Sequence, residues 1–416
     1  MGTATEEFDG IVHQLASREL GQPDPVDQYK SEPLLKALKA TGPELWIDTG
    51  DLELARSVWR TELTALTTNN TLANQVVQSG AMDDVIRSTV EKLKDAAGSL
   101  SREELILEIG FVINCHIALR LVEAFRVKVS VELHPSLARD IGKTLRYARR
   151  YYSVCPEYFI VKIPLTPEGY LSVRKLGREG IPINYTLGFS ARQNYLAARL
   201  SNPDYVNVFL GRLNQVVADN GLGSGEMVGE KVTLSTQREL RQLRAVNPNA
   251  RSRLIGASIR NGEQVAALAG LDVLTIPPKA MQDFVDSGRK PDSIKSQVEN
   301  DPEPGVDLDQ MWGAKCSALW EVNDSFRQGI DQLMGAPNLD EMTGEELTGF
   351  LESRDVHLFH RFTQAELDSM YDHGKIPKIS AWPESVGLDD LMTQSALMSF
   401  RKDQDALDAR IESFLN

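Results

Sequence analysis

Short apolar runs alternate with longer amphipathic stretches through most of the chain. The short runs are rich in β-branched residues and have the length of strands, and the chain between successive runs is long enough for a helix. Eight such runs predict eight strands, at residues 45–48, 63–67, 127–132, 158–163, 181–186, 205–209, 253–258 and 273–276. Eight strand–helix units over about 250 residues favour an α/β fold of the (β/α)8 TIM-barrel type, and a doubly wound sheet is the structural alternative.

Amphipathic helices are predicted before the first strand. The i, i+3, i+4, i+7 spacing of a helix with one apolar face is followed by Phe8, Ile11, Val12 and Leu15. Residues 32–39 favour a second helix by their propensity.

The chain changes character after the last predicted strand. A Pro- and Gly-containing loop at residues 300–305 precedes capping-box patterns that begin at Thr343 and Thr363 and predict helix starts. Apolar residues at positions 407, 411, 414 and 415 share one face of a final helix. We therefore expect a catalytic barrel with N-terminal helices over residues 1–282 and a helical C-terminal extension, packed on the barrel, over residues 283–416.

Composition argues against several functional classes. The net charge of −14 is unlike that of a general nucleic-acid binder, whose binding face is basic. Three cysteines are too few for a disulfide framework, and the N-terminus lacks the layout of a signal peptide. No apolar run is expected to approach the length of a membrane span. These features predict a cytoplasmic protein that binds neither nucleic acid nor membranes.

Two short motifs suggest ligands but lack the context that such ligands require. The run Gly221 to Gly225 looks like a nucleotide loop, but it follows a helical pattern rather than a strand. His357 and His360 have no further ligands at convincing zinc spacing. We therefore expect neither a metal nor a cofactor.

Polar residues recur near the carboxyl ends of the predicted strands. They are Asp48, Asn69, Glu132, Lys162, Asn184, Thr186, Asn207, Ser258 and Arg260. These ends form the active-site face of a TIM barrel. Because an unpaired charge inside a barrel is costly, several charges at equivalent strand ends predict a functional site rather than chance.

Lys162 is the central candidate, because it lies between apolar residues in a predicted strand. Burial removes hydration and favours the neutral amine, which is the nucleophile that forms Schiff bases with carbonyl substrates. The alternative is a structural lysine paired with Glu132 or Asp48. The pattern alone leaves both interpretations open.

Seven segments, in the right order, resemble those of the transaldolase family. They are Trp-Ile-Asp-Thr-Gly-Asp at 46–51, Thr-Thr-Asn-Asn-Thr-Leu at 67–72, Val-Ser-Val-Glu at 129–132, Val-Lys-Ile-Pro-Leu-Thr-Pro-Glu-Gly at 161–169, Asn-Tyr-Thr-Leu-Gly-Phe-Ser at 184–190, Gly-Arg at 211–212 and Gly-Ala-Ser-Ile-Arg-Asn at 256–261. The resemblance implies transfer of a dihydroxyacetone unit from a ketose phosphate (sedoheptulose 7-phosphate or fructose 6-phosphate) to an aldose phosphate, through a lysine Schiff base.

The resemblance also implies a role for each catalytic residue. Lys162 would form the imine, and Asp48 would remove the proton of the carbon-4 hydroxyl. Glu132 and Thr186 would hold a water that moves protons while the imine forms and hydrolyses.

Further residues are implied to bind the substrate. Asn69 and Asn184 would hydrogen-bond the three-carbon unit, although strand-end capping is the alternative for both. Arg212, Ser258 and Arg260 would bind the phosphate, since guanidinium groups match phosphate geometry. For the two arginines, surface ion pairs are the alternative.

Three departures from the family pattern put donor specificity in doubt. Asn70 and Val208 each stand where proline is usual, and Asn207 stands where a serine that contacts the donor is usual. The departure at Asn207 leaves open a rival function, a transaldolase for a modified sugar such as a sulfosugar.

Two other rivals remain. A fructose-6-phosphate aldolase-like lyase would typically carry Gln in place of Glu132 and Tyr in place of Phe209, and both positions here match the transferase. A catalytically silent binding barrel is disfavoured by the retained charged residues. We expect phosphorylated sugars as ligands, and assembly into a homo-oligomer stays open.

Overall fold

Eight parallel strands close into a barrel in sequence order, in a computed structural model that describes residues 2–96, 98 and 100–415. The strands are β1 (Glu44–Asp48), β2 (Leu63–Thr67), β3 (Lys128–Glu132), β4 (Phe159–Pro164), β5 (Ile183–Thr186), β6 (Tyr205–Phe209), β7 (Arg253–Ala257) and β8 (Val273–Ile276). All eight predicted strands are present with ends shifted by two residues or fewer. The TIM-barrel prediction is confirmed, and the doubly wound alternative is wrong.

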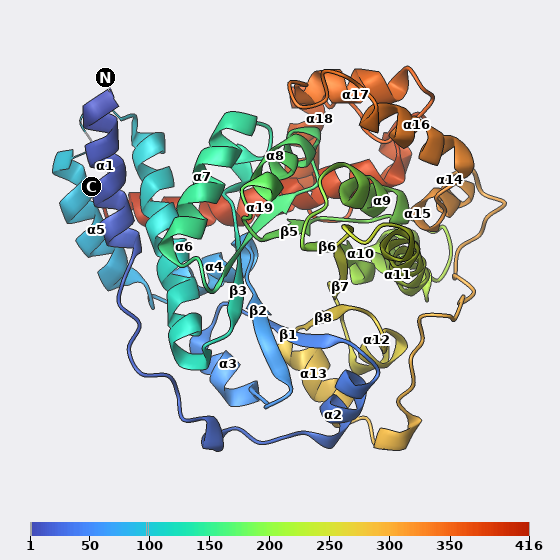
Figure 1. The fold of residues 1–416 in the computed structure, drawn as a ribbon, viewed down its shortest axis with the longest axis horizontal. Coiled ribbons are helices and arrows are strands. Elements are labelled where there is room, and N and C mark those ends of the chain that lie inside the picture. The colour runs from blue at the N-terminus through green and yellow to red at the C-terminus, as the bar shows by residue number, and fades with distance from the viewer. Residues whose placement is uncertain (1, 97, 99, 416) are drawn as a thin grey trace.

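Helices surround the barrel and precede it (Figure 1). Before β1 lie α1 (Gly2–Ala16), the 3-10 helix η1 (Val26–Gln28) and α2 (Pro33–Ala40). The helices between strands are α3 (Leu52–Val58), α4 (Asn70–Gln78), α5 (Asp83–Ala96), α6 (Arg102–Phe125), η2 (Pro135–Leu137), α7 (Ile141–Val154), α8 (Pro167–Arg178), α9 (Ala191–Leu200), α10 (Leu210–Asp219), α11 (Val228–Val246) and α12 (Gly262–Ala267). The two N-terminal helices expected from the sequence are thus present.

The chain after β8 is helical, as expected. It forms α13 (Pro278–Val285), η3 (Pro291–Ser293), α14 (Met311–Lys315), α15 (Ser317–Trp320), α16 (Asp324–Met334), α17 (Gly344–Glu352), α18 (Gln364–His373), η4 (Ile379–Ala381) and α19 (Leu388–Glu412). Both predicted capping boxes are formed, at the starts of α17 and α18. The final helix ends at Glu412, so Phe414 and Leu415 lie beyond it, contrary to the expectation that they share its face.

α19 is the longest helix of the C-terminal part and crosses behind the barrel, from α18 toward α5 and α6 (Figure 1). It packs against α4, α6, α18 and η2. Because α4 and η2 follow β2 and β3, this packing places α19 beside the carboxyl ends of those strands.

α6 corrects one expectation from the sequence. It is 24 residues long and apolar enough, by length and composition, to cross a membrane, so the expectation that no apolar run approaches that length is wrong. Most of this apolar stretch is buried inside the protein, where α6 packs against α1, α5, α19 and β3. Core packing therefore accounts for its hydrophobicity, since a helix that is apolar all round suits a protein interior as well as a membrane.

The register of the strands aims polar side chains into the barrel. Side chains alternate along a strand, and the pairing of β3, β4 and β5 aligns Glu132 with Lys162 and Lys162 with Asn184. At the same end of the barrel, Asp48 on β1 is aligned with Thr67 on β2. Five neighbouring strands, β1 to β5, thus deliver polar residues to one end of the barrel.

Candidate active site

A cavity of about 400 Å³ opens at the carboxyl ends of the strands. Nine of the eleven predicted site residues line it: Asp48, Asn69, Lys162, Asn184, Asn207, Phe209, Arg212, Ser258 and Arg260. The remaining two, Glu132 and Thr186, are buried in the neighbouring wall. Residues that are more than 200 positions apart in the chain therefore meet in one site.

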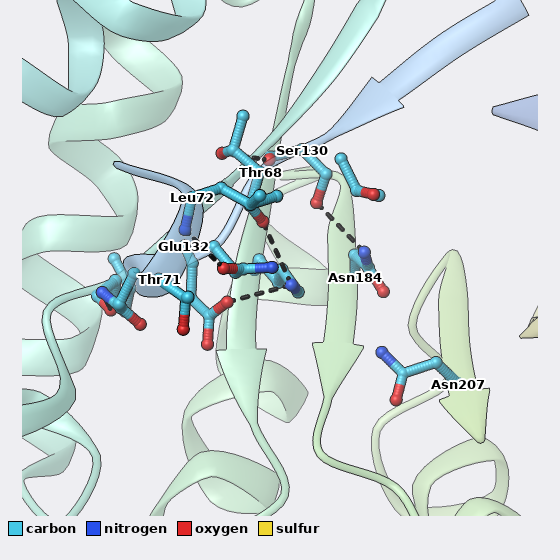
Figure 2. A network of polar contacts seen from close by, with 12 residues as sticks. Thr68, Thr71, Leu72, Ser130, Glu132, Asn184 and Asn207 are labelled. Atoms are coloured by element: carbon cyan, nitrogen blue, oxygen red, sulfur yellow. Dashed lines mark hydrogen bonds and ion pairs between the residues drawn. The ribbon is translucent and has the colours of Figure 1, made fainter. Parts of the chain in front are cut away.

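Lys162 and Glu132 form a buried ion pair in the wall of this cavity. Lys162 Nζ lies 2.9 Å from Glu132 Oε2, and both side chains are less than 5% exposed. The ammonium also donates a hydrogen bond to the Thr68 carbonyl oxygen at 3.1 Å (Figure 2). Burial raises the pKa of Glu132, although the neighbouring Lys162 charge opposes this. A carboxylate with raised proton affinity at this distance can accept the proton that must leave the ammonium before it becomes a nucleophile.

Pairing with Glu132 is one of the two pairings, with Glu132 or with Asp48, expected for a structural lysine. The pair by itself does not decide between a structural and a catalytic lysine. Lys162, however, also lines the cavity, so a ligand there can reach its amine.

Asp48 sits in a chain of hydroxyl groups. Thr67 Oγ1 donates to Asp48 Oδ1 at 2.6 Å and lies 2.5 Å from Thr275 Oγ1. Burial raises the pKa of Asp48, while the charges of Lys162 and Arg260 and the Thr67 hydrogen bond lower it. Asp48 is thus an oriented carboxylate that faces the cavity and has the chemistry of a general base.

Thr186 and Asn184 hold unpaired polar atoms inside the barrel. Thr186 is fully buried, and its hydroxyl has no hydrogen-bond partner within the described part of the chain. Asn184 donates to Ser130 Oγ at 3.0 Å, as the two labelled side chains in Figure 2 show, but its buried Oδ1 has no partner among the described residues. Because buried polar groups are normally satisfied, these atoms are suited to a water or a substrate hydroxyl.

Asn69 and its neighbour Asn70 hydrogen-bond to different parts of the protein. Asn69 Oδ1 caps α4 by accepting from the Leu72 amide at 2.9 Å, so the capping alternative is confirmed for this residue. Asn69 also lines the cavity. Asn70 is buried and donates to Gln404 Oε1 on α19 at 3.0 Å. The departure at position 70 is therefore explained by the C-terminal helix that docks on it.

Asn207 lies apart from the Lys162 network (Figure 2) and uses its amide on the backbone. Its Nδ2 donates to the Tyr185 carbonyl oxygen at 2.5 Å, and its Oδ1 accepts from the Gly188 amide at 3.2 Å. These bonds tie β6 to the end of β5. Asn207 still lines the cavity, next to Phe209, so its contact with a donor substrate stays a prediction.

Arg212, Ser258 and Arg260 gather at one part of the cavity. A side chain at Gly211 would place its Cβ 2.2 Å from the Ser258 carbonyl oxygen, so glycine at this position allows the two segments to approach. Neither arginine makes an ion pair within the described chain, and Nη1 of the buried Arg212 has no partner there. The alternative of surface ion pairs is therefore wrong.

Burial and the nearby Arg260 charge lower the pKa of Arg212 to about 10. Its guanidinium carbon lies 5.8 Å from the centre of the Phe209 ring and 5.4 Å from that of Phe400, within the range of a cation–π contact. Two rings thus hold a cation that lines the cavity. Such a group is suited to an anion.

The sequence interpretation missed several residues of this site. Thr67, Thr275 and Ser130 orient Asp48 and Asn184, and they lie in or beside the strands that were predicted. Lys375, Ser399, Phe400 and Asp403 also line the cavity, but they come from the C-terminal extension. No local pattern marks them, because they reach the site only through the packing of α18 and α19.

Comparison with known proteins identifies the family of this chain. The family model described as transaldolase/fructose-6-phosphate aldolase matches residues 45–335. The chain is similar to a transaldolase of Xanthomonas euvesicatoria pv. vesicatoria, with 25% identity over 76% of this chain and 92% of that protein. It is similar to a transaldolase of Kluyveromyces lactis, with 28% identity over 61% and 75% of the two chains. A probable transaldolase of Thermus thermophilus is 32% identical over 56% and 86%.

Proposed function

Because this chain belongs to the transaldolase/fructose-6-phosphate aldolase family, we propose that it moves a dihydroxyacetone unit from a ketose phosphate to an aldose phosphate through a Schiff base on Lys162. The observation that carries the proposal is the buried Lys162–Glu132 pair, 2.9 Å apart, in a cavity that also holds Asp48 and two arginines without ion-pair partners in the described chain. This arrangement supplies a nucleophile, a base and an anion site together.

The first step is attack of Lys162 on the ketose carbonyl at carbon 2. Glu132 takes the ammonium proton, and the neutral amine adds to the carbonyl carbon. Loss of water from the adduct then leaves a protonated imine. A water held by Glu132 and the Thr186 hydroxyl carries the protons of this step, which is consistent with the raised pKa of Glu132 and the unpartnered Thr186 hydroxyl among the described residues.

The second step breaks the bond between carbons 3 and 4. Asp48 removes the proton of the carbon-4 hydroxyl, the electron pair of the bond moves toward the iminium nitrogen, and the shortened aldose leaves. The three-carbon enamine remains on Lys162, with Asn69 and Asn184 placed to hydrogen-bond its hydroxyl groups. An acceptor aldehyde is captured by the reverse of this step, and hydrolysis of the imine regenerates the amine.

Phosphate binding sets the substrate in place. Arg212, Arg260 and Ser258 line the same cavity as Lys162, so a phosphate held there leaves the carbonyl end of the sugar toward the amine. Substrate positioning of this kind lowers the entropic part of the barrier.

The test is borohydride trapping with fructose 6-phosphate, followed by peptide mass spectrometry. The three-carbon adduct is expected on the peptide that contains Lys162 and is expected to disappear in Lys162→Met. An adduct on Lys128 or Lys175 instead would contradict the assignment. Without trapping on any lysine, the Schiff-base proposal fails as a whole.

A lyase of the same family is the second candidate. It would release dihydroxyacetone without waiting for an aldehyde. Phe209 lines the cavity at the position where such lyases typically carry Tyr, which favours transfer, because Phe209 cannot donate a hydrogen bond to an attacking water. Rapid dihydroxyacetone release in the absence of an acceptor would favour the lyase.

A further inference from the structure

The anion end of the cavity is built by two distant parts of the chain. Arg212 and Arg260 come from the barrel, whereas Lys375 follows α18 and Asp403 lies on α19. All four line the same cavity. The family match ends at residue 335, so Lys375 and Asp403 lie outside the segments that define the family.

Lys375 is close enough to both arginines to be affected by their charges. Partial burial is the main cause that lowers the pKa of Lys375, and the charges of Arg260 and Arg212 lower it further. The charges of Asp219 and Asp403 oppose the change. Within the described residues Lys375 makes no ion pair of its own. Repulsion between three cations in one cavity destabilises the fold. An anion that binds among them offsets this repulsion.

Arg212 gives a second indication, independent of Lys375, that a ligand binds at this end of the cavity. Its side chain is 7% exposed, lines the cavity and has a buried Nη1 without a partner in the part of the chain that is described. A buried charged donor left unpaired is costly. Phe400 on α19 packs against the guanidinium, so the extension holds this arginine in place as well as adding Lys375.

The formal charge of the anion end matches a dianion. Among the residues that line this end of the cavity, Arg212, Arg260 and Lys375 contribute three positive charges and Asp403 one negative charge, which leaves two positive charges. Asp219 also acts on Lys375 but does not line the cavity. A phosphate ester carries about −1.5 to −2 near pH 7, whereas a sulfonate carries a single negative charge. Since the Coulomb energy scales with the product of charges, an added cation favours the phosphate over the sulfonate.

We propose that Lys375, supplied by the C-terminal extension, is a third cation of the anion subsite and selects a sugar with a dianionic phosphate over one with a monoanionic sulfonate. The proposal rests on the proposed function only in taking the anion to be part of a sugar substrate. It assigns the extension a role in specificity, beyond packing on the barrel.

Contacts of α19 hold this end of the cavity in place. Thr71 on α4 donates a hydrogen bond to Asp403, and Asn70 donates to Gln404. Asn70 is one of the departures from the family pattern. Asn70 and Lys375 are therefore parts of one arrangement, in which the C-terminal extension packs on α4.

The test compares Lys375→Gln with the matched control Lys378→Gln, which removes an exposed lysine of the same segment that does not line the cavity. Calorimetric titrations with methyl phosphate and methanesulfonate at low salt measure the two anion classes without any chemistry. Because Lys375 is exposed at the edge of the cavity, we expect Lys375→Gln to weaken methyl phosphate binding about three- to tenfold. Binding of methanesulfonate should weaken clearly less. Lys378→Gln should leave the binding of both anions unchanged.

Two results would overturn the inference. Unchanged methyl phosphate binding in Lys375→Gln would remove Lys375 from the subsite, and an equal loss on both anions would remove its role in selection. Borohydride trapping of the unmodified protein with fructose 6-phosphate, run in parallel, tests the proposed function separately. A positive trapping result with unchanged anion binding refutes the role of Lys375 alone, and the opposite pattern refutes the Schiff-base function alone.

Discussion

Lys162 Nζ and Glu132 Oε2 lie 2.9 Å apart on neighbouring strands, and each side chain is almost completely buried. A buried ion pair contributes little net stability, because desolvation offsets the attraction. The proposed function gives the pair a role in proton transfer, in which Glu132 takes a proton from Lys162 when a carbonyl substrate binds.

Glu132→Gln keeps the shape of the side chain but removes this proton acceptor. We expect imine formation to slow by about 10²–10⁴-fold, the usual contribution of an acid–base group. The rate at which the borohydride-trappable adduct appears measures the effect. Glu62→Gln is the matched control, because Glu62 is also buried but precedes β2, at the other end of the barrel. An unchanged trapping rate in Glu132→Gln would contradict the role.

Phe209→Tyr places a hydroxyl group in the cavity and should divert the reaction from transfer to release. The new hydroxyl can orient a water toward the enamine or imine, so the intermediate no longer depends on an aldehyde. Dihydroxyacetone formed from fructose 6-phosphate, with and without erythrose 4-phosphate, measures the partition. Phe350→Tyr on α17 controls for the added hydroxyl, since Phe350 does not line the cavity. An unaltered partition in Phe209→Tyr would argue against this explanation of transfer.

Arg260→Gln should raise KM for phosphorylated ketoses more than for unphosphorylated ones. A hydrogen bond to a charged group contributes about 1.5–3 kcal/mol, and partial exposure of Arg260 reduces this to about 1–2 kcal/mol, or about five- to thirtyfold in KM. Arg289→Gln is the control, because Arg289 pairs with Glu263 outside the cavity. Equal losses on both kinds of ketose would show that Arg260 does not contact the phosphate.

Asp389→Asn should destabilise the docking of α19. Asp389 is fully buried and accepts two hydrogen bonds from Arg192 at 2.7 Å each, as well as one from Ser190. Loss of one partner of a buried ion pair costs about 3–5 kcal/mol, which denaturant unfolding will measure. Asp84→Asn, in an exposed pair with Arg87, should change the free energy of unfolding by less than about 1 kcal/mol. Similar losses in both variants would refute the docking role.

Asp390→Asn should flatten the pH dependence of stability. Burial raises the pKa of Asp390 to about 7, with Asp389 adding to the shift and Arg139 and the His360 amide opposing it. This pKa exceeds the ordinary value of 3.8, so the protonated carboxyl stabilises the fold. Its contribution is fully present below about pH 4 and is lost as pH rises through about 7, by as much as about 4 kcal/mol.

The measurement is denaturant unfolding of both proteins between pH 4 and 8. The free energy of unfolding of the unmodified protein should fall relative to that of Asp390→Asn across this range. Parallel curves would show that Asp390 does not titrate within it. Asp84→Asn again controls for loss of a carboxylate at the surface.

Hydrophobic patterning identified the strands but could not distinguish a core helix from a membrane span. The apolar runs of the barrel strands are local signals, because each strand is buried whatever its neighbours are. The length and hydrophobicity of α6 can also be seen in the local sequence, but the elements that pack around it cannot. Only the packing of α1, α5, α19 and β3 around α6 shows that its apolar surface is covered by protein.

The sequence by itself predicted the eight strands and favoured the barrel, and its strand-end pattern marked seven of the nine predicted residues that meet in the cavity, whereas Phe209 and Arg212 were marked by the resemblance to a known family. The pattern could mark those seven because alternation along each strand and the common direction of parallel strands bring strand-end residues together. The tertiary structure alone decided which atoms pair, as for Lys162 with Glu132 and for Asn207 with the backbone of β5. It also decided the part taken by the extension, because Asn70 and Gln404 are separated by 334 positions in the chain. Contacts across such a separation leave no periodic or local pattern, so Lys375 and Asp403 could be assigned to the cavity only after the fold had brought them there.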